Sequence, residues 1–180
     1  ISDVQIYDTT LSESEIWDLY SKSQPKSTGQ VSRWKLDGNA LDSWGSNDGT
    51  VSGATVVQGW EQCPPKGVAT DHRSIQDFDG INDYVNCGND SSLDFTDNSF
   101  SISFWVYPDQ LDDLNIIMAR GTYNVRGWYI REAGSGMVQI VLNKSGSNDY
   151  WQTNAGAIAV GNWYHIAIVV DGTAARIYSN

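Results

Sequence analysis

The sequence predicts an all-β fold in which short strands form a sandwich or barrel, with one helix near the N-terminus. Many segments alternate apolar and polar residues with a period of two, and turn residues separate these segments. The 17 Gly and 4 Pro, together with frequent Ser, Asn, Asp and Thr, fit many short connections. A chain of 180 residues is long enough to bury one hydrophobic core.

The N-terminal part holds the clearest local signals. Residues 4–7 alternate as a strand, and residues 11–20 form an amphipathic helix. Ser12 and Glu15 have the spacing of a capping box, while Leu11 and Ile16 have the spacing of a hydrophobic staple. Residues 21–30 contain Pro25 and Gly29 among polar residues, which indicates a linker or a long loop.

The rest of the chain has the period of strands. Residues 32–36 are half buried, with Trp34 and Leu36 on one face, and residues 37–53 form a loop rich in Asp and Asn. A second irregular tract covers residues 60–74, and strand character resumes over residues 78–85. The strongest strand spans residues 100–107, and further strands are expected at residues 116–119, 127–131, 137–143, 163–170 and 174–179.

Charge limits the classes of partner. Lys and Arg number 11 against 22 Asp and Glu, a formal charge of −11 that repels nucleic acid and anionic lipid. No stretch approaches the ~20 apolar residues that span a bilayer, so membrane insertion is not expected. The first residue is not Met, which leaves open both a removed secretion signal and an excerpt from a longer protein.

Cysteine and histidine are too sparse for a zinc site. Cys63 and Cys87 do not have metal-ligand spacing, and His72 and His165 lie far apart. The two cysteines either form a disulfide or remain separate buried thiols, and the sequence leaves both open. His165 is interpreted as a hydrogen-bonded structural residue in a strand.

The loop after residue 36 is dense in oxygen ligands suited to calcium. The same residue types also form turns and cap loops, so a purely structural role is the alternative. The candidate ligands in this loop are Asp37, Asn39, Asp42, Asn47 and Asp48.

Aromatic residues in or beside loops are the candidates for ligand contact, because rings stack on apolar and cationic groups and on sugar rings. A surface-covering role is the alternative for each. These residues are Trp44, Trp60, Tyr123, Tyr150 and Trp151.

Three ordered motifs resemble the concanavalin A-like, laminin G-like jelly-roll modules of bacterial extracellular proteins. They are residues 78–85, residues 100–106 and residues 161–167 with the following Asp171-Gly172. The resemblance implies a jelly-roll sandwich of two antiparallel sheets and an extracellular or cell-surface location. It makes residues 31–180 a module without its last strands, and residues 1–20 the closing strand and helix of such a module.

First and last strands are neighbours in this architecture, so the resemblance implies that residues 4–7 pair beside residues 33–36. A strand edge left unpaired would favour homo-oligomers. The resemblance also adds Asp3 to the calcium ligands.

Glycoside hydrolases share this jelly roll, but the Glu-x-Asp-x-x-Glu run of its glucanases is absent here. The nearest approach, Glu13-Ser14-Glu15, lies at a helix start, where acids favour the positive end of the dipole. We therefore expect a non-catalytic binding or adhesion module whose ligand is carbohydrate. A structural spacer or protein–protein adhesion repeat is the first alternative, and a polysaccharide-active hydrolase or lyase is the second.

Overall fold

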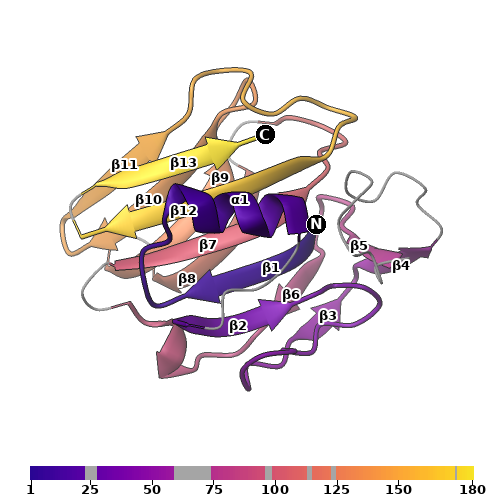
Figure 1. Ribbon diagram of the computed structural model, residues 1–180. Coiled ribbons are helices and arrows are strands. Elements are labelled where there is room, and N and C mark those ends of the chain that lie inside the picture. The colour runs from indigo at the N-terminus through magenta and orange to yellow at the C-terminus, as the bar shows by residue number, and fades with distance from the viewer. Residues whose placement is uncertain (23–27, 59–73, 96–98, 113–114, 123–124, 173) are drawn as a thin grey trace.

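The protein is a sandwich of antiparallel sheets, and the one α-helix of its described residues lies on the outer face, as seen in a computed structural model (Figure 1). The structure describes all residues except 23–27, 59–73, 96–98, 113–114, 123–124 and 173. One sheet has five strands in the order β13-β12-β7-β1-β2, and the other has four in the order β11-β10-β9-β8. The strands of the first are β1 (Ser2–Tyr7), β2 (Gln30–Trp34), β7 (Ser99–Val106), β12 (Tyr164–Asp171) and β13 (Ala175–Ser179). The strands of the second are β8 (Asn115–Thr122), β9 (Arg126–Glu132), β10 (Val138–Lys144) and β11 (Ser147–Gln152). This architecture confirms the all-β prediction.

Two smaller sheets complete the described part. β3 (Thr50–Ser52) pairs with β6 (Tyr84–Asn86), and β4 (Thr55–Gln58) pairs with β5 (Ser74–Asp77). A short 3-10 helix, η1 (Ser91–Leu93), precedes β7. Each of these strands has only three or four residues, so none offers a long alternating pattern to sequence inspection.

The N-terminal strand β1 lies inside the five-stranded sheet rather than at its edge. It pairs with β2, where Val4 lies opposite Trp34, and with β7, where Ile6 lies opposite Ile102. All six residues of β1 are buried. The predicted pairing of residues 4–7 beside the strand that follows the linker is therefore confirmed.

The main core fills the space between the two large sheets. On β7, Phe100, Ile102 and Phe104 point into it, as the alternating pattern predicts. The four-stranded sheet contributes Ile130 and Ile140, both fully buried. Ser101 and Ser103 lie on the opposite face of β7, beneath the helix.

The helix α1 (Glu13–Lys22) covers that outer face (Figure 1). Its capping box is formed: the Ser12 backbone N–H donates to Glu15 Oε2 over 2.8 Å, and the Glu15 N–H faces Ser12 Oγ at 3.4 Å. Leu11 and Ile16 are buried in one cluster with Leu19, Ala167 and Val169. The structural interpretation of Glu15 is thus confirmed.

Two local predictions are corrected. The strand expected over residues 78–85 is mostly a turn, because Asp79 Oδ1 accepts from the Ile81 N–H, and the Asp79 N–H donates to Asp83 Oδ2. Gly80 has φ +74°, which favours glycine. Tyr150 and Trp151, expected beside loops, lie within strand β11.

Candidate functional site

The loop of residues 37–49 is organised around the carboxylate of Asp42. Asp42 Oδ1 accepts hydrogen bonds from the backbone N–H groups of Arg33 at 2.9 Å, Trp44 at 3.0 Å and Gly45 at 2.9 Å. Asp42 Oδ2 accepts from the Asn47 N–H at 3.0 Å. Partial burial acts to raise the pKa of Asp42, but these donors outweigh it and the pKa is lowered. The loop geometry therefore depends on an ionised Asp42.

The other predicted calcium ligands of this loop also make hydrogen bonds within the protein, and among them Asn39 Oδ1 accepts from the Leu41 N–H at 2.9 Å. Asp48 Oδ1 accepts from the Asp42 N–H at 2.8 Å. Asn47 is buried and uses its Nδ2 to donate to Ser32 Oγ and Ser92 Oγ. Asp37 accepts a hydrogen bond from Ser74 through its backbone carbonyl. These contacts match the turn-forming alternative stated for the loop.

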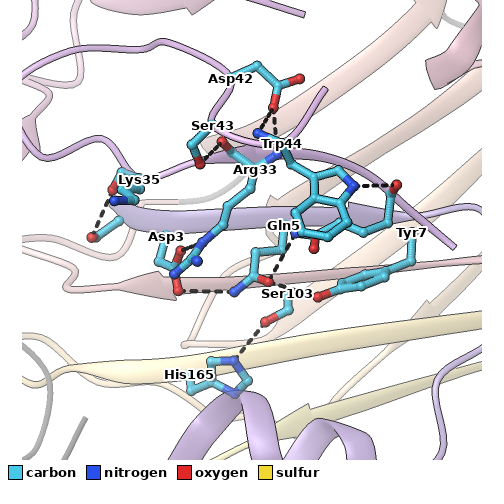
Figure 2. A network of polar contacts seen from close by, with 12 residues as sticks. Asp3, Gln5, Tyr7, Arg33, Lys35, Asp42, Ser43, Trp44, Ser103 and His165 are labelled. Atoms are coloured by element: carbon cyan, nitrogen blue, oxygen red, sulfur yellow. Dashed lines mark hydrogen bonds and ion pairs between the residues drawn. The ribbon is translucent and has the colours of Figure 1, made fainter. Parts of the chain in front are cut away.

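Asp3 meets a cationic side chain of the protein. Arg33 Nε donates to Asp3 Oδ1 at 2.7 Å, and Gln5 Nε2 donates to Asp3 Oδ2 at 3.0 Å (Figure 2). Both oxygens of this buried carboxylate therefore already have donors, and the guanidinium belongs to the residue whose backbone binds Asp42.

Calcium takes six to eight oxygen ligands, and both carboxylate oxygens of Asp42 and of Asp3 already accept hydrogen bonds from the protein. Among the residues that the structure describes, no three His, Cys, Asp or Glu side chains are grouped to hold a metal. Calcium binding in the loop of residues 37–49 thus stays a prediction, and the geometry does not support it.

Trp44 is the best placed of the aromatic candidates. Its backbone N–H is held by Asp42, and its indole Nε1 donates to the Gln30 carbonyl oxygen at 2.9 Å (Figure 2). The side chain remains 45% exposed. Because hydrogen bonds hold both the backbone and the indole of Trp44, the residue loses little conformational entropy when a ligand stacks on its exposed ring.

A buried polar network continues from this site under the helix. The Tyr7 hydroxyl donates to Gln5 Oε1 at 2.7 Å, and Gln30 Nε2 donates to the same oxygen at 3.3 Å. Sequence reasoning did not select Gln5, Gln30 or Arg33, because strand alternation identifies faces but not which polar residues meet across strands. Gln30 holds the indole of Trp44 through its carbonyl oxygen, and Gln5 and Arg33 hold the carboxylate of Asp3.

His165 belongs to the structural interior. It is only 2% exposed, and its Nε2 lies 2.7 Å from Ser103 Oγ. Burial lowers the pKa of His165 to about 4, so the ring is neutral at pH 7. Its ring packs against Trp105 and Tyr20. The structural interpretation is confirmed, whereas His72 lies outside the described residues.

The other aromatic candidates do not join Trp44 in one groove. Tyr150 is exposed on β11, while the neighbouring Trp151 packs partly against the core. β11 borders β13 at one edge of the five-stranded sheet, and Trp44 lies beside β2 at the other edge. Trp60 and Tyr123 lie outside the described residues.

Cys87 is half-buried and bonds to no other cysteine among the described residues. Burial, with a further contribution from the charge of Asp42, raises the pKa of Cys87 to about 11. Cys63 lies outside the described residues, so both alternatives, a Cys63–Cys87 disulfide and two separate thiols, stay predictions.

Comparison with known proteins identifies the C-terminal part of the chain. A family model described as the concanavalin A-like lectin/glucanases superfamily matches residues 79–180. No curated protein and no solved structure matches the chain. None of the helices in the described ranges has the length and apolar character to cross a bilayer.

Proposed function

Because the chain belongs to the concanavalin A-like lectin/glucanase superfamily, we propose that it is a non-catalytic binding module and that its ligand is carbohydrate. Domains of the laminin G-like type are generally binding modules, which supports the first half of the proposal. The second half depends on the surface around Trp44. The same proposal places the module in a secreted or cell-surface protein.

The observation that carries the proposal is the fixed, half-exposed indole of Trp44. The apolar face of a sugar ring stacks on an aromatic ring, while its hydroxyl groups need polar partners at the rim. Ser43, the exposed neighbour of Trp44 in the loop, donates its hydroxyl to the Arg33 carbonyl oxygen of β2 and can still accept a hydrogen bond (Figure 2). An exposed ring beside an exposed hydroxyl supports the proposal of a sugar ligand.

Anionic polymers are poor ligands for this surface. The formal charge of −11 repels polyanions at moderate salt. Asp42 adds a carboxylate that stays ionised through its lowered pKa, directly beside Trp44. Neutral glycans are therefore the expected ligand class.

The test is a glycan array followed by calorimetric titration of each hit, using the intact chain. We expect Trp44→Ala to weaken binding at least tenfold, which corresponds to about 1.4 kcal/mol. Trp44→Phe keeps a ring but loses the bond to the Gln30 carbonyl, so it should retain part of the affinity. Trp17→Ala is the matched control, because Trp17 is 61% exposed on α1 and should leave binding unchanged.

Two results would contradict the proposal. Failure of every glycan to bind, with calcium present, would favour the structural spacer or adhesion repeat. Release of reducing sugar or unsaturated product from a polysaccharide would favour the enzyme.

A further inference from the structure

The outer face of the four-stranded sheet carries an ordered set of polar and aromatic side chains. On β10, Ile140 and Leu142 point into the core, so Gln139, Val141 and Asn143 face outward. The one α-helix of the described residues, α1, lies on the other sheet (Figure 1). Access to the outward residues of β9, β10 and β11 is therefore not limited by α1.

A row of hydrogen-bonded side chains crosses the three strands. Arg131 on β9 and Gln152 on β11 stand opposite Gln139 on its two sides. Arg131 Nε donates to Gln139 Oε1 at 2.7 Å, and Gln139 Nε2 donates to Gln152 Oε1 at 2.7 Å. Gln139 is only 4% exposed, so the row is held from a buried centre. Each member fixes its neighbour, which gives the guanidinium of Arg131 a defined orientation.

Two tyrosines flank the next outward position along β10. Tyr129 on β9 and Tyr150 on β11 both stand opposite Val141. Neighbouring strands lie about 4.8 Å apart, so the backbones of the two tyrosines are separated by about 10 Å. Val141 is 3% exposed whereas Tyr150 is 63% exposed, so a low floor lies between taller side chains. With Arg131 and Gln152, the tyrosines form a slot that has one aromatic end and one polar end.

Arg131 supplies the charge of this slot. Among the outward residues of β9, β10 and β11 that the structure describes, it is the one charged side chain. Its Cζ lies 5.7 Å from the centroid of the Tyr129 ring. In the described ranges Arg131 forms no ion pair, and of its guanidinium nitrogens only Nε has a hydrogen-bond partner. The two Nη groups can therefore bind a carboxylate in bidentate fashion.

We propose that this slot binds a single hexuronic acid residue of a glycan. The carboxylate pairs with the Nη groups of Arg131, and the apolar face of the pyranose ring stacks on Tyr150. Ring hydroxyls accept from Gln152 Nε2, which has a second hydrogen to donate. The inference rests on the proposed function for its ligand class, carbohydrate, and adds a second site and an acidic sugar.

The net charge of the protein limits the ligand further. A formal charge of −11 repels a polymer of uronic acids, whereas one carboxylate paired with Arg131 is neutralised locally. The expected ligand is thus one uronate in an otherwise neutral glycan. Trp44 belongs to a different surface, because its indole bonds to β2 in the other sheet.

The probes are methyl β-D-glucuronide and methyl β-D-glucoside, titrated separately into the intact isotope-labelled chain and followed by NMR. The two sugars differ only in the exocyclic group, a carboxylate in one and a hydroxymethyl group in the other. We expect amide shifts in β9, β10 and β11, with a dissociation constant of about 1–10 mM for the glucuronide. The glucoside should bind at these strands at least fivefold more weakly. Concentrated sodium chloride should weaken only the glucuronide.

Matched variants separate the roles of charge and ring. Arg131→Met should reduce the affinity for the glucuronide to that for the glucoside, while Arg131→Lys keeps the charge without the planar fork and should retain part of it. Tyr150→Ala should weaken both sugars at this site. Arg176→Met removes the same charge from an exposed ion pair on β13 and should change neither affinity.

Equal affinity of the two sugars at β9, β10 and β11 would overturn the proposal, as would an Arg131→Met variant with a native amide spectrum and unchanged binding. Acetate that shifts the same amides as strongly as the glucuronide would show a carboxylate site without sugar recognition, and would also overturn it. If neutral glycans bind through Trp44 while the glucuronide fails, this inference alone falls. Glucuronide binding without any effect of Trp44→Ala on neutral glycans would support the slot and contradict the Trp44 site.

Discussion

Arg33 connects the two acidic residues on either side of it, donating its Nε to Asp3 Oδ1 at 2.7 Å and its backbone N–H to Asp42 Oδ1 at 2.9 Å. One residue thereby holds the N-terminal strand β1 and the loop of residues 37–49 to β2. The Asp3 side chain is 4% exposed and that of Arg33 is 14% exposed, so the pair is largely shielded from water.

Removing Arg33 should therefore destabilise the fold strongly. We expect Arg33→Met to lower the free energy of unfolding by about 3 kcal/mol, because the buried Asp3 carboxylate would lose its cation. The double variant Asp3→Asn, Arg33→Met should regain part of this loss; Asn also tolerates the positive φ of +47° at position 3. Urea unfolding of each variant measures the effect.

The control for this prediction is the exposed pair of Arg176 and Asp171. We expect Arg176→Met to change stability by less than about 0.5 kcal/mol, since exposed ion pairs contribute little. Equal effects of Arg33→Met and Arg176→Met would contradict the structural role given to Arg33.

Calcium is the second prediction to test. Because the carboxylates of Asp3 and Asp42 are engaged by donors of the protein itself, we expect the same melting temperature in EGTA and in millimolar calcium. An ion that binds only the folded state at 100 times its dissociation constant would add about 2.7 kcal/mol and raise that temperature. A clear rise in calcium, lost in Asp42→Asn, would restore the calcium site predicted from the sequence.

His165 should make stability depend on pH. Its pKa is lowered to about 4 in the folded protein, so on acidification the unfolded state, with a pKa near 6.5, takes up the proton first. The stabilisation is complete above pH ~6.5 and is lost as the pH falls toward ~4. Between pH 7.5 and pH 5 we expect this residue to account for about 2 kcal/mol of lost stability.

The matched variant is His165→Gln, which keeps a hydrogen-bonding group near Ser103 but does not titrate. Its stability should fall less than that of the wild type over the same pH range, in urea unfolding at both pH values. Parallel pH profiles for the two proteins would show that His165 is protonated equally in both states.

Cys87 should react slowly as long as the protein is folded. A thiol with a pKa of about 11 has roughly one thiolate in a thousand at pH 8, so iodoacetamide should label it far more slowly than in urea. Mass spectrometry without reductant decides its pairing. We expect a free thiol that is labelled after unfolding, and a mass lower by two hydrogens with no labelling in urea would instead show a disulfide.

Long alternating segments made most of the fold predictable from sequence. Residues 100–107 predicted β7 within one residue at each end, and the spacing of Ser12 and Glu15 predicted the helix start. β11 was missed because its first residues, Ser147 to Asp149, are polar and the strand lies at a sheet edge with little of it buried. Antiparallel pairing with β10 holds these residues in a strand although their own sequence does not predict one.

The candidate site was predictable only in part. Trp44 could be selected as a loop aromatic, but its orientation depends on the Gln30 carbonyl, fourteen residues earlier in the chain. The Asp and Asn residues of the same loop predicted an oxygen-rich cluster. In the structure, Asp42 of this cluster accepts hydrogen bonds from the backbone N–H groups of Arg33 and Trp44 and so orders the loop. Such long-range pairings have no local pattern.

The central position of β1 also bears on how the chain folds. Leu11 bonds to Ser101 across a sequence separation of 90, and β1 cannot find its place between β2 and β7 until that distance is closed. Closing long loops before contacts form slows folding, so domains dominated by such contacts fold in about milliseconds to seconds. The central strand of the five-stranded sheet therefore depends on one of the longest-range contacts in the chain, and we expect its pairing to limit the folding rate.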